Sequence, residues 1–236
     1  MNTLRGVSLG THRSQLNGDR MRTILMLSSA NRKTGDVNHT VHLPADTGIS
    51  QALKTGADES VCGDCDLRPS KRNICYVNHR WLLNIEKVDY PDLSDLEPAQ
   101  QAYLDLRLNY FTTRLGSMGD PASDTRHLKM LTRHNKTVGY TQQWNKPQFQ
   151  DLRSDMMASV ASPQMAEQAQ SQDWRTYRIK TEDEPLMENE ILCPHPRLQC
   201  RDCGLCSGGK GKNIAQNVHG IKAKQNNYLK LRGMIK

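Results

Sequence analysis

Short apolar stretches, separated by polar connections that contain glycine and proline, recur along most of this chain. Residues 23–28 (TILMLS) form a short apolar run that predicts a buried strand. Residues 39–43 (HTVHL) alternate before a proline and predict a second strand. Residues 76–86 carry apolar side chains at helical spacing, and residues 97–107 indicate a stronger helix with a proline in its first turn.

From residue 109 onward the alternation of strands and helices becomes regular. Helices are predicted over residues 124–133 and 162–171. Strands are predicted at residues 110–115, 137–141, 155–160, 174–179, 190–193 and 213–218. Strands that alternate with helices or long connections pair mainly in parallel. We therefore expect an α/β fold with a mostly parallel, partial-barrel-like β/α array that carries two cysteine-rich metal loops.

The pattern also divides the chain into three parts. Residues 1–22 are polar and lack periodicity, which predicts a flexible N-terminal arm. Residues 23–220 are interpreted as a single α/β metal-binding domain. Residues 221–236 carry five cations and no acidic residue, which predicts a basic C-terminal tail.

Composition restricts the compartment in which the protein works. No apolar run approaches the roughly 18 residues that a membrane span needs, and the N-terminus lacks the apolar segment of a secretion signal. Seven cysteines is an odd number, and their spacings are too close for good disulfides. These features predict a protein of the reducing cytoplasm that does not contact a membrane.

Charge is distributed unevenly along the chain. Residues 1–54 have a net charge of +4 and residues 207–236 a net charge of +7, whereas residues 55–206 have a net charge of −4. Basic ends are typical of segments that contact polyanions, although solvated tails give the same pattern. Alternatively, the apolar side chains of the tail dock it on the core or on a partner. The predicted nucleic-acid-binding residues, in which lysines follow phosphates and a tyrosine stacks on a base, are Lys222, Lys224, Tyr228, Lys230, Arg232 and Lys236.

The cysteines fall into two groups within loop sequence, where no apolar segment requires them for packing. The second group has the spacing C-x6-C-x2-C-x2-C and consists of Cys193, Cys200, Cys203 and Cys206. Three thiolates at intervals of three residues wrap one corner of a compact cluster, as in the cysteine run of bacterial ferredoxins, whereas zinc sites usually combine two separate C-x2-C pairs. The spacing indicates a 4Fe–4S cluster or zinc, and it leaves the two alternatives open.

The first group, Cys62, Cys65 and Cys75 (C-x2-C-x9-C), lacks a fourth cysteine nearby. A 4Fe–4S cluster held by three cysteines keeps one iron position open to another ligand. A zinc ion would be completed by a histidine, and His79 is the nearest in sequence. A third alternative is that the two groups pool their ligands in one site.

Polar side chains at the predicted strand ends are candidates for catalysis, because sites in parallel α/β folds are built there. We single out Asp120 after residues 110–115, Tyr140 within residues 137–141, and Arg178 near the end of residues 174–179. An aspartate between glycine and proline caps a turn as often as it orients a ligand, and buried aromatics are common. Nucleotide-binding glycine loops, the GxSxG motif and the HExxH motif are absent from the sequence.

Several short motifs in order carry a family resemblance. They are CGDC and CYVN, followed by RLGSMGDP, GYTQQW, MMASV, WRTYRI, EILCP, CRDCGLC and NVHG. Over roughly residues 25–220 the chain resembles the uncharacterised phage and plasmid cysteine-rich "gene product 88"-like family. The resemblance implies a phage origin and expression in the cytoplasm of a bacterial host. A cysteine loop that leads into an α/β array is also similar to radical S-adenosylmethionine enzymes, although the C-x3-C-x2-C motif of those enzymes is missing.

Two hypotheses of function follow. In the first, the metal holds loops in place and the basic ends bind nucleic acid, with single-stranded DNA in phage transcription or replication as the favoured ligand and a phage or host polymerase as a partner. In the second, the chain is an iron–sulfur enzyme resembling the radical S-adenosylmethionine class, with Asp120, Tyr140 and Arg178 around the substrate.

Overall fold

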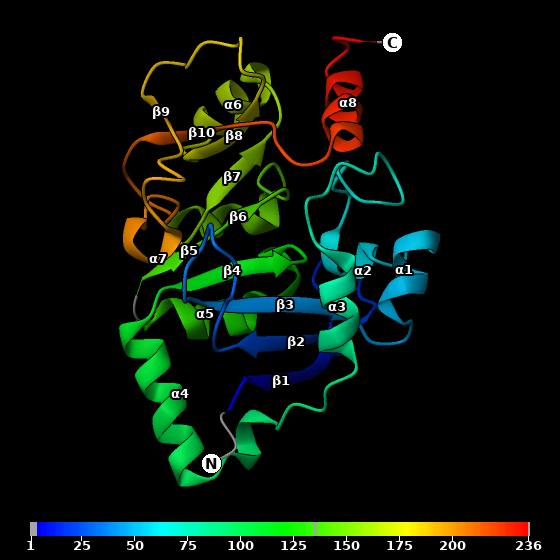
Figure 1. Ribbon diagram of the computed structural model, residues 1–236, viewed down its shortest axis with the longest axis vertical. Helices are drawn as coiled ribbons and strands as arrows, with labels where there is room; N and C mark the ends of the chain where they lie inside the picture. The colour runs from blue at the N-terminus through cyan, green and yellow to red at the C-terminus, as the bar shows by residue number, and fades with distance from the viewer. Residues whose placement is uncertain (1–3, 135, 236) are drawn as a thin grey trace.

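The computed structural model describes residues 4–134 and 136–235, and these form an α/β fold with two five-stranded sheets (Figure 1). The first sheet has the order β1-β2-β3-β4-β5 and the second the order β6-β7-β8-β10-β9. The strands are β1 (Gly6–Arg13), β2 (Arg20–Met26), β3 (Asn38–Pro44), β4 (Thr113–Met118), β5 (Thr137–Val138), β6 (Tyr140–Thr141), β7 (Met157–Val160), β8 (Thr176–Lys180), β9 (Glu190–Leu192) and β10 (Asn213–Asn217).

Parallel pairing dominates, as the sequence predicts. Among the described residues, β1 with β2 and β2 with β3 are antiparallel, and the other six strand pairs are parallel. The two sheets are joined through residues 137–141, which the sequence predicts as one strand. That strand is divided at Gly139 into β5 and β6, so the first sheet ends where the second begins. The described strands form two separate sheets that do not close into a barrel.

Gly139 is required at the junction of the sheets by a close approach of backbone and side chain. A Cβ atom at this position would lie 2.8 Å from the Cβ of Leu115 on β4. The carbonyl of Gly139 accepts a hydrogen bond from the amide of Met157 (3.1 Å), and its own amide donates to the carbonyl of Cys206 (3.0 Å). The change of sheet thus also fixes a cysteine loop.

Helices cover both faces of the first sheet. The helices are α1 (Ile49–Thr55), α2 (Glu59–Cys62), α3 (His79–Glu86), α4 (Pro98–Tyr110), α5 (Thr125–Thr132), α6 (Pro163–Gln170), α7 (Cys200–Cys203) and α8 (Lys222–Leu231), with the 3-10 helices η1 (Leu93–Asp95), η2 (Pro121–Asp124) and η3 (Pro147–Ser154). Helices α4, α5 and α6 contribute to the larger apolar core, whereas α1, α2 and α3 contribute to a second core on β2 and β3. None of the helices in the described ranges is long and apolar enough to cross a membrane.

The expectation of a flexible arm over residues 1–22 is wrong for the part that the structure describes. Residues of this segment form β1 and the start of β2, and Val7 and Met21 are fully buried. The pairing of β1 with β2 is interrupted between Ser8 and Thr11, where Gly10 adopts a positive φ. This irregularity breaks the alternation of apolar and polar residues, so the sequence gives only a weak indication of a strand. The first sheet therefore includes an N-terminal edge strand.

Two further expectations differ in their boundaries. Residues 110–115 are predicted as a strand, but α4 continues through Tyr110 and β4 begins at Thr113. Residues 76–86 are predicted as a helix, and α3 begins three residues later, where the Asn78 side chain accepts hydrogen bonds from the amides of Arg80 and Trp81. Capping of the helix end sets the boundary in the second case.

The basic C-terminal tail docks on the second sheet through helix α8. Helix α8 buries Tyr228, whose side chain is 1% exposed and donates to the carbonyls of Ala161 and Ile179 (3.0 and 2.7 Å). Arg232 lies 2.8 Å from Glu184 and donates to Ala161 as well. The docking alternative is the one that the structure supports.

Substitution of Tyr228 by alanine is expected to cost about 3–5 kcal/mol of unfolding free energy, the usual range for a buried aromatic side chain. The loss arises because a cavity forms and the carbonyl of Ile179 loses the Tyr228 hydroxyl as its donor, whereas the carbonyl of Ala161 keeps Arg232. Urea unfolding measures it. Lys222→Ala, on the exposed surface of the same helix, is the matched control and is expected to change stability by less than about 0.5 kcal/mol. Equal stability of the two variants would contradict the docked position.

Acid is expected to weaken the first sheet through His39 on β3. Burial lowers the pKa of His39 from 6.5 to about 4, and the guanidinium of Arg114, its partner across the β3–β4 pair, lowers the pKa as well. The unfolded chain therefore binds this proton more readily than the folded chain. The contribution of His39 to stability is complete above pH 6.5 and is lost as the pH falls from 6.5 towards 4.

This shift corresponds to about 3 kcal/mol at the acid end. The measurement is the free energy of unfolding in urea at several pH values for the wild type and for His39→Gln, which takes up no proton. The variant is expected to show a shallower decline between pH 6.5 and 4. His42, whose pKa is also lowered by burial to about 4, contributes to the remaining slope. Parallel curves for the two proteins would refute this origin of the acid sensitivity.

Candidate metal centres

The first cysteine group is made compact by a loop that folds back on itself. Cys62 ends α2, and the amide of Cys65 donates to the carbonyl of Cys62 (3.4 Å). Residues 68–74 then form a tight loop, and the amide of Cys75 donates to the carbonyl of Leu67 (2.8 Å) where the loop closes. The nine residues between Cys65 and Cys75 therefore form a loop that brings Cys75 back to Leu67, which is two residues after Cys65 in the chain.

This group lies at the carboxyl ends of parallel strands, where the sequence predicts a site. Asp120, just beyond β4, donates its amide to the carbonyl of Val61 (2.6 Å), next to Cys62. Gln143, just beyond β6, donates from Nε2 to the carbonyl of Cys62 (3.3 Å). In Figure 1, α2 lies beyond the arrowhead of β4. Two strand exits thus hold the helix that carries Cys62.

Two buried acceptor atoms beside the first group have no hydrogen-bond partner among the described residues. They are Oδ2 of Asp58 and Oε1 of Gln143. Asp58 is fully buried one helical turn before Cys62, and its other oxygen, Oδ1, lies 3.5 Å from Nη1 of Arg68 and accepts from Ser70 (3.3 Å). A buried acceptor without a donor is costly and is a common sign of an ion or ligand.

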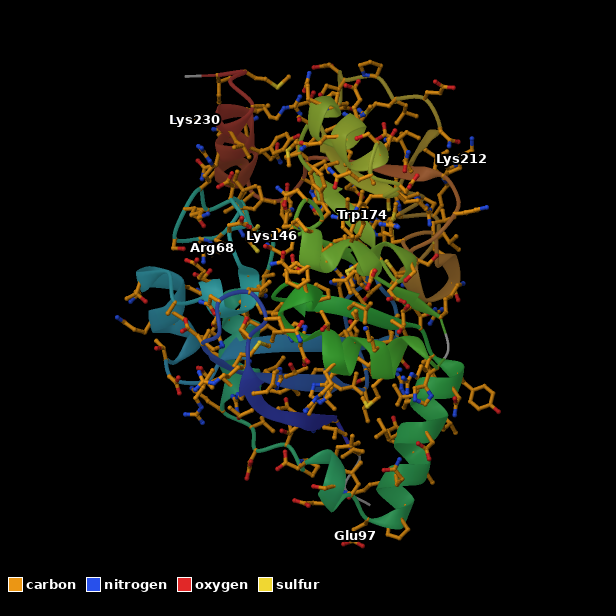
Figure 2. The ribbon with its side chains drawn as sticks, turned by 180° about the vertical axis from the view of Figure 1, so that it is seen from behind. Arg68, Glu97, Lys146, Trp174, Lys212 and Lys230 are labelled. Atoms are coloured by element: carbon orange, nitrogen blue, oxygen red, sulfur yellow. The ribbon has the colours of Figure 1, made fainter. Side chains whose placement is uncertain are left out.

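Positively charged side chains surround the loop of the first group. Arg68 is buried, not solvated, and lies between Asp58 and Glu59. Lys146, which Figure 2 shows on the same side of the molecule, places its Nζ 3.1 Å from Oδ2 of Asp64. Lys224 of α8 donates to the carbonyl of Cys75. These contacts fix the loop without occupying the thiols.

The cysteines of the first group are half-buried. Burial raises the pKa of Cys62 well above its ordinary value, and Cys75, Cys65 and Asp58 raise it as well. Burial likewise raises the pKa of Cys65 to about 12, and that of Cys75 also lies above its ordinary value. A positive ion among the sulfurs reverses this preference, because it favours the thiolate.

The second group surrounds a cavity of about 30 Å³ on the second sheet. Cys193 extends β9, and its amide donates to the carbonyl of Ala215 on β10 (2.8 Å). The carbonyl of Cys206 is held by Gly139, and the amide of Cys200 donates to the carbonyl of Lys33 (3.2 Å). The cavity is lined by Arg114, Val138, Gly139, Tyr140, Cys193, Pro194, His195, Leu198, Cys200, Cys203, Gly204, Leu205, Cys206 and Ile214.

Arg175 fixes the loop that follows the second group. Its guanidinium donates to the carbonyls of Leu205, Ser207 and Lys212, at 2.8, 2.7 and 2.5 Å. Close packing also excludes a side chain at Gly208, where a Cβ atom would lie 2.3 Å from the backbone of Ser154. One buried arginine on the sheet therefore satisfies the carbonyls of an otherwise irregular segment.

Aromatic side chains form the floor of the second group. Tyr140 and Tyr177 stack with ring centroids 4.3 Å apart, and Arg114 donates to the hydroxyl of Tyr140 (3.3 Å). Burial raises the pKa of Cys206 to about 12, with the other three cysteines adding to the rise. The structure thus brings one predicted catalytic residue, Tyr140, to a cysteine group, although the sequence assigned it to strand exits around a substrate.

The two groups form separate sites. Figure 1 shows α2 and α7 on opposite sides of the array, at different ends of β4. The four thiols of the second group line one cavity, and none of the first group does. Pooling of the ligands in one site is therefore wrong. Within the described ranges, no three cysteine sulfurs lie within 4.8 Å of one another.

Asp120 and Arg178 are held in the interior by hydrogen bonds. Asp120 accepts from the hydroxyl of Thr141 and the amides of Gln142 and Ala122 (2.7, 2.7 and 3.0 Å), while burial raises its pKa to about 6. Arg178 has no exposed surface and pairs with Glu190. Its guanidinium is thus directed to partners within the fold, and a catalytic role of Arg178 stays a prediction.

The predicted nucleic-acid residues of the tail do not act as one surface. Tyr228 is buried and cannot stack on a base, Lys224 binds the first cysteine loop, and Arg232 pairs with Glu184. Lys222 and Lys230 are exposed, and Figure 2 shows Lys230 on α8. Lys236 and the side chain of His79, the predicted zinc ligand, lie outside the described residues.

Asp58 is the residue of the first group that sequence reasoning missed. A signal was present, because an acidic residue four positions before a cysteine in a helix lies on the same face as that cysteine. Comparison with known proteins gives no further guide to the site. No family model, curated protein or solved structure matches this chain. The resemblance to the gene product 88-like family, and the phage origin that it implies, stay predictions.

Proposed function

We propose that the chain is an iron–sulfur enzyme in which Cys62, Cys65 and Cys75 hold a cluster with one open iron position. The observation that carries the proposal is the position of three half-buried cysteines and the unpartnered Oδ2 of Asp58 at the carboxyl ends of β4 and β6. Sites of parallel α/β enzymes are built at this edge. A site made only to staple a loop would have no need of an open position there.

The donor set fits an iron–sulfur cluster better than a single zinc ion. Four ligand atoms around one zinc, with Zn–S bonds of about 2.3 Å, lie roughly 4 Å from one another. The sulfurs of each group are more widely spread, since no three of them among the described residues lie within 4.8 Å of one another. A cluster that contains several iron atoms needs the wider spacing.

When bound at the first group, the cluster would supply redox chemistry and a coordination position for a substrate or cofactor. The protein residues prepare that position. The unpartnered oxygens of Asp58 and Gln143 beside the cysteine loop would accept hydrogen bonds from a ligand bound there, so together they would favour a ligand with hydrogen-bond donors. Asp120 positions α2 by its backbone contact to Val61 and excludes water by its burial.

The second group has a different role in this proposal. Four cysteines complete a cluster and leave no open position. Their loop packs on Tyr177 and Ile214, so a metal there stabilises the cover of the second sheet. We assign this centre to structure and electron transfer, and the first centre to the reaction.

Nucleic-acid binding is the weaker proposal. Single-stranded DNA binding in phage transcription or replication, with a polymerase as partner, is supported by the uneven charge alone, because Tyr228 is buried. The test of this proposal is the salt dependence of DNA affinity, which is expected to fall steeply as the salt concentration rises.

The experiment for the enzyme proposal is metal and sulfide analysis of protein purified without oxygen, with absorption and electron paramagnetic resonance spectra. Two 4Fe–4S clusters correspond to about eight iron atoms and eight sulfides. Cys65→Ser is expected to lose about half of both, and Asp58→Asn is expected to keep the iron but change the spectrum of the reduced first cluster. S-adenosylmethionine serves as a probe of the open position, and a shifted spectrum on its addition would place the enzyme near that class. Protein that contains zinc without iron or sulfide would overturn the proposal.

A further inference from the structure

A third cluster of metal-ligating side chains lies away from both cysteine groups. It consists of His12 on β1, Asp124 at the start of α5, and His127 in the first turn of α5. One nitrogen or oxygen from each of the three residues lies within 4.8 Å of the others. Nε2 of His12 lies 3.2 Å, and Nδ1 of His127 2.7 Å, from the same oxygen, Oδ2 of Asp124. We propose that these residues bind a divalent transition-metal ion of the zinc class.

The ring nitrogens of His12 distinguish this cluster from an ordinary hydrogen-bonded carboxylate. Both ring nitrogens of His12 are inaccessible to solvent and lack a hydrogen-bond partner among the described residues. Nε2 is close to Asp124 but lacks the alignment of a hydrogen bond. An imidazole that presents an unused nitrogen to a negative carboxylate and a second imidazole is suited to a cation between them.

The Asp124 carboxylate is in its ionised form, which is the form that binds a metal ion. Burial raises the pKa of Asp124, but its neighbours His12, His127 and Thr23 lower it more, so that it lies well below its ordinary value. The hydroxyl of Thr23 donates to Oδ2 of Asp124 (2.7 Å) and fixes its orientation. Such outer contacts to a ligand are a regular part of metal sites.

His127 can supply its Nδ1 to an ion after a small change. Nδ1 of His127 faces Asp124, and Nη2 of Arg126 lies 3.3 Å from Nε2 of the same ring. Binding through Nδ1 moves the ring proton to Nε2, which requires Arg126 to turn away. Arg126 is exposed, so this movement meets no obstacle.

Space beside the cluster is enough for one water molecule. A cavity of about 10 Å³ adjoins Asp124 and His127 and is lined in part by Thr23, Thr40 and His42. Three protein ligands and a water complete four-coordinate zinc. The cavity has no room for a substrate, which assigns the ion to structure. It would tie the N-terminal edge strand β1 to α5, which is more than 100 residues away in the chain.

Zinc and cobalt binding test the site, because the two ions report on its stoichiometry and its ligands. The proteins compared are the wild type, His12→Gln, and His134→Gln as a control that removes an exposed histidine. Wild type and control are expected to bind one more equivalent of Zn²⁺ than His12→Gln. That equivalent is expected to raise the melting temperature only in the first two proteins. Cobalt in the same position gives visible bands without the near-ultraviolet absorption of sulfur ligands, which separates it from the cysteine centres.

Two further variants keep the test decisive. Thr23→Val, which removes the hydroxyl beside Asp124, is expected to weaken Zn²⁺ binding about 10- to 100-fold. If His127→Gln does not fold, His12→Gln alone decides, because His12 lies partly exposed on an edge strand. Equal zinc stoichiometry and equal melting temperatures in wild type and His12→Gln would overturn the site and leave a carboxylate held by two imidazoles. Iron and sulfide contents report on the cysteine centres separately.

Discussion

Serine in place of Cys206 is expected to remove the second metal centre and loosen the loop that covers the second sheet. The sulfur is one of four around a single cavity, and the loop packs on Met157, Tyr177 and Ile214. Without the metal, the loop depends on the carbonyl contacts of Arg175. We expect a loss of stability of about 2–5 kcal/mol, comparable with loss of a native disulfide.

Urea unfolding and metal analysis measure the two effects of Cys206→Ser. Ser207→Ala is the matched control, because the contact of residue 207 with Arg175 uses only its backbone carbonyl. The control is expected to keep wild-type metal content and stability. Cys62→Ser is expected to lose the first centre while the second remains. Full metal content in Cys206→Ser, or loss of both centres together, would contradict two separate sites.

Methionine in place of Arg178 is expected to destabilise the protein by about 3–5 kcal/mol, because a buried negative charge loses its partner. Glu190 has 1% of its side chain exposed and accepts from Arg178 at 2.9 and 2.7 Å. Glu184 lies 3.7 Å away and keeps its pairing with Arg232. The loss is thus assigned mainly to Glu190.

The double variant Arg178→Met with Glu190→Met tests that assignment, since replacing both partners by apolar side chains is often nearly neutral. It is expected to recover most of the stability lost in the single variant, measured by urea unfolding. Iron and sulfide contents of both variants are expected to match the wild type, because Arg178 contacts neither cysteine group. A reduced metal content at full stability would instead return Arg178 to the functional site.

The positions of most strands along the chain and their mainly parallel pairing could be predicted from sequence, because most buried strands leave a local apolar run. Residues 155–160 and 174–179 correspond in this way to β7 and β8. The edge strand β1 could not be predicted with the same rule. Its residues alternate over only a few positions, and its pairing shifts at Gly10, so the sheet partner determines it more than the local pattern.

The docking of the C-terminal tail could not be predicted from the sequence for a related reason. Among its many cations, Tyr228 gives no local sign of whether it stacks on a base or enters the core. The decision comes from the carbonyl of Ala161, just after β7, and that of Ile179 on β8, both of which accept from the buried Tyr228 hydroxyl. A tail that is basic in sequence thus becomes part of the fold.

For the cysteines, the local sequence indicates the chemistry, but the positions of the two groups depend on contacts between distant parts of the chain. Their spacing indicates metal, yet it does not say that Cys75 folds back onto Leu67 or that two sites lie on opposite sides of the array. The cluster of His12 with Asp124 and His127 has no local signal at all, because it forms only when β1 joins the sheet beneath α5.

The division of one strand at Gly139 has a mechanical consequence for the two centres. The amide at this point holds the loop of Cys206, and three residues later the amide of Gln142 holds Asp120, which in turn holds the helix of Cys62. An extended segment of this length spans about 10 Å and can barely stretch. The chain therefore sets a fixed spacing between the anchor points of the two cysteine loops, and a displacement at one anchor passes to the other along the short segment between Gly139 and Gln142.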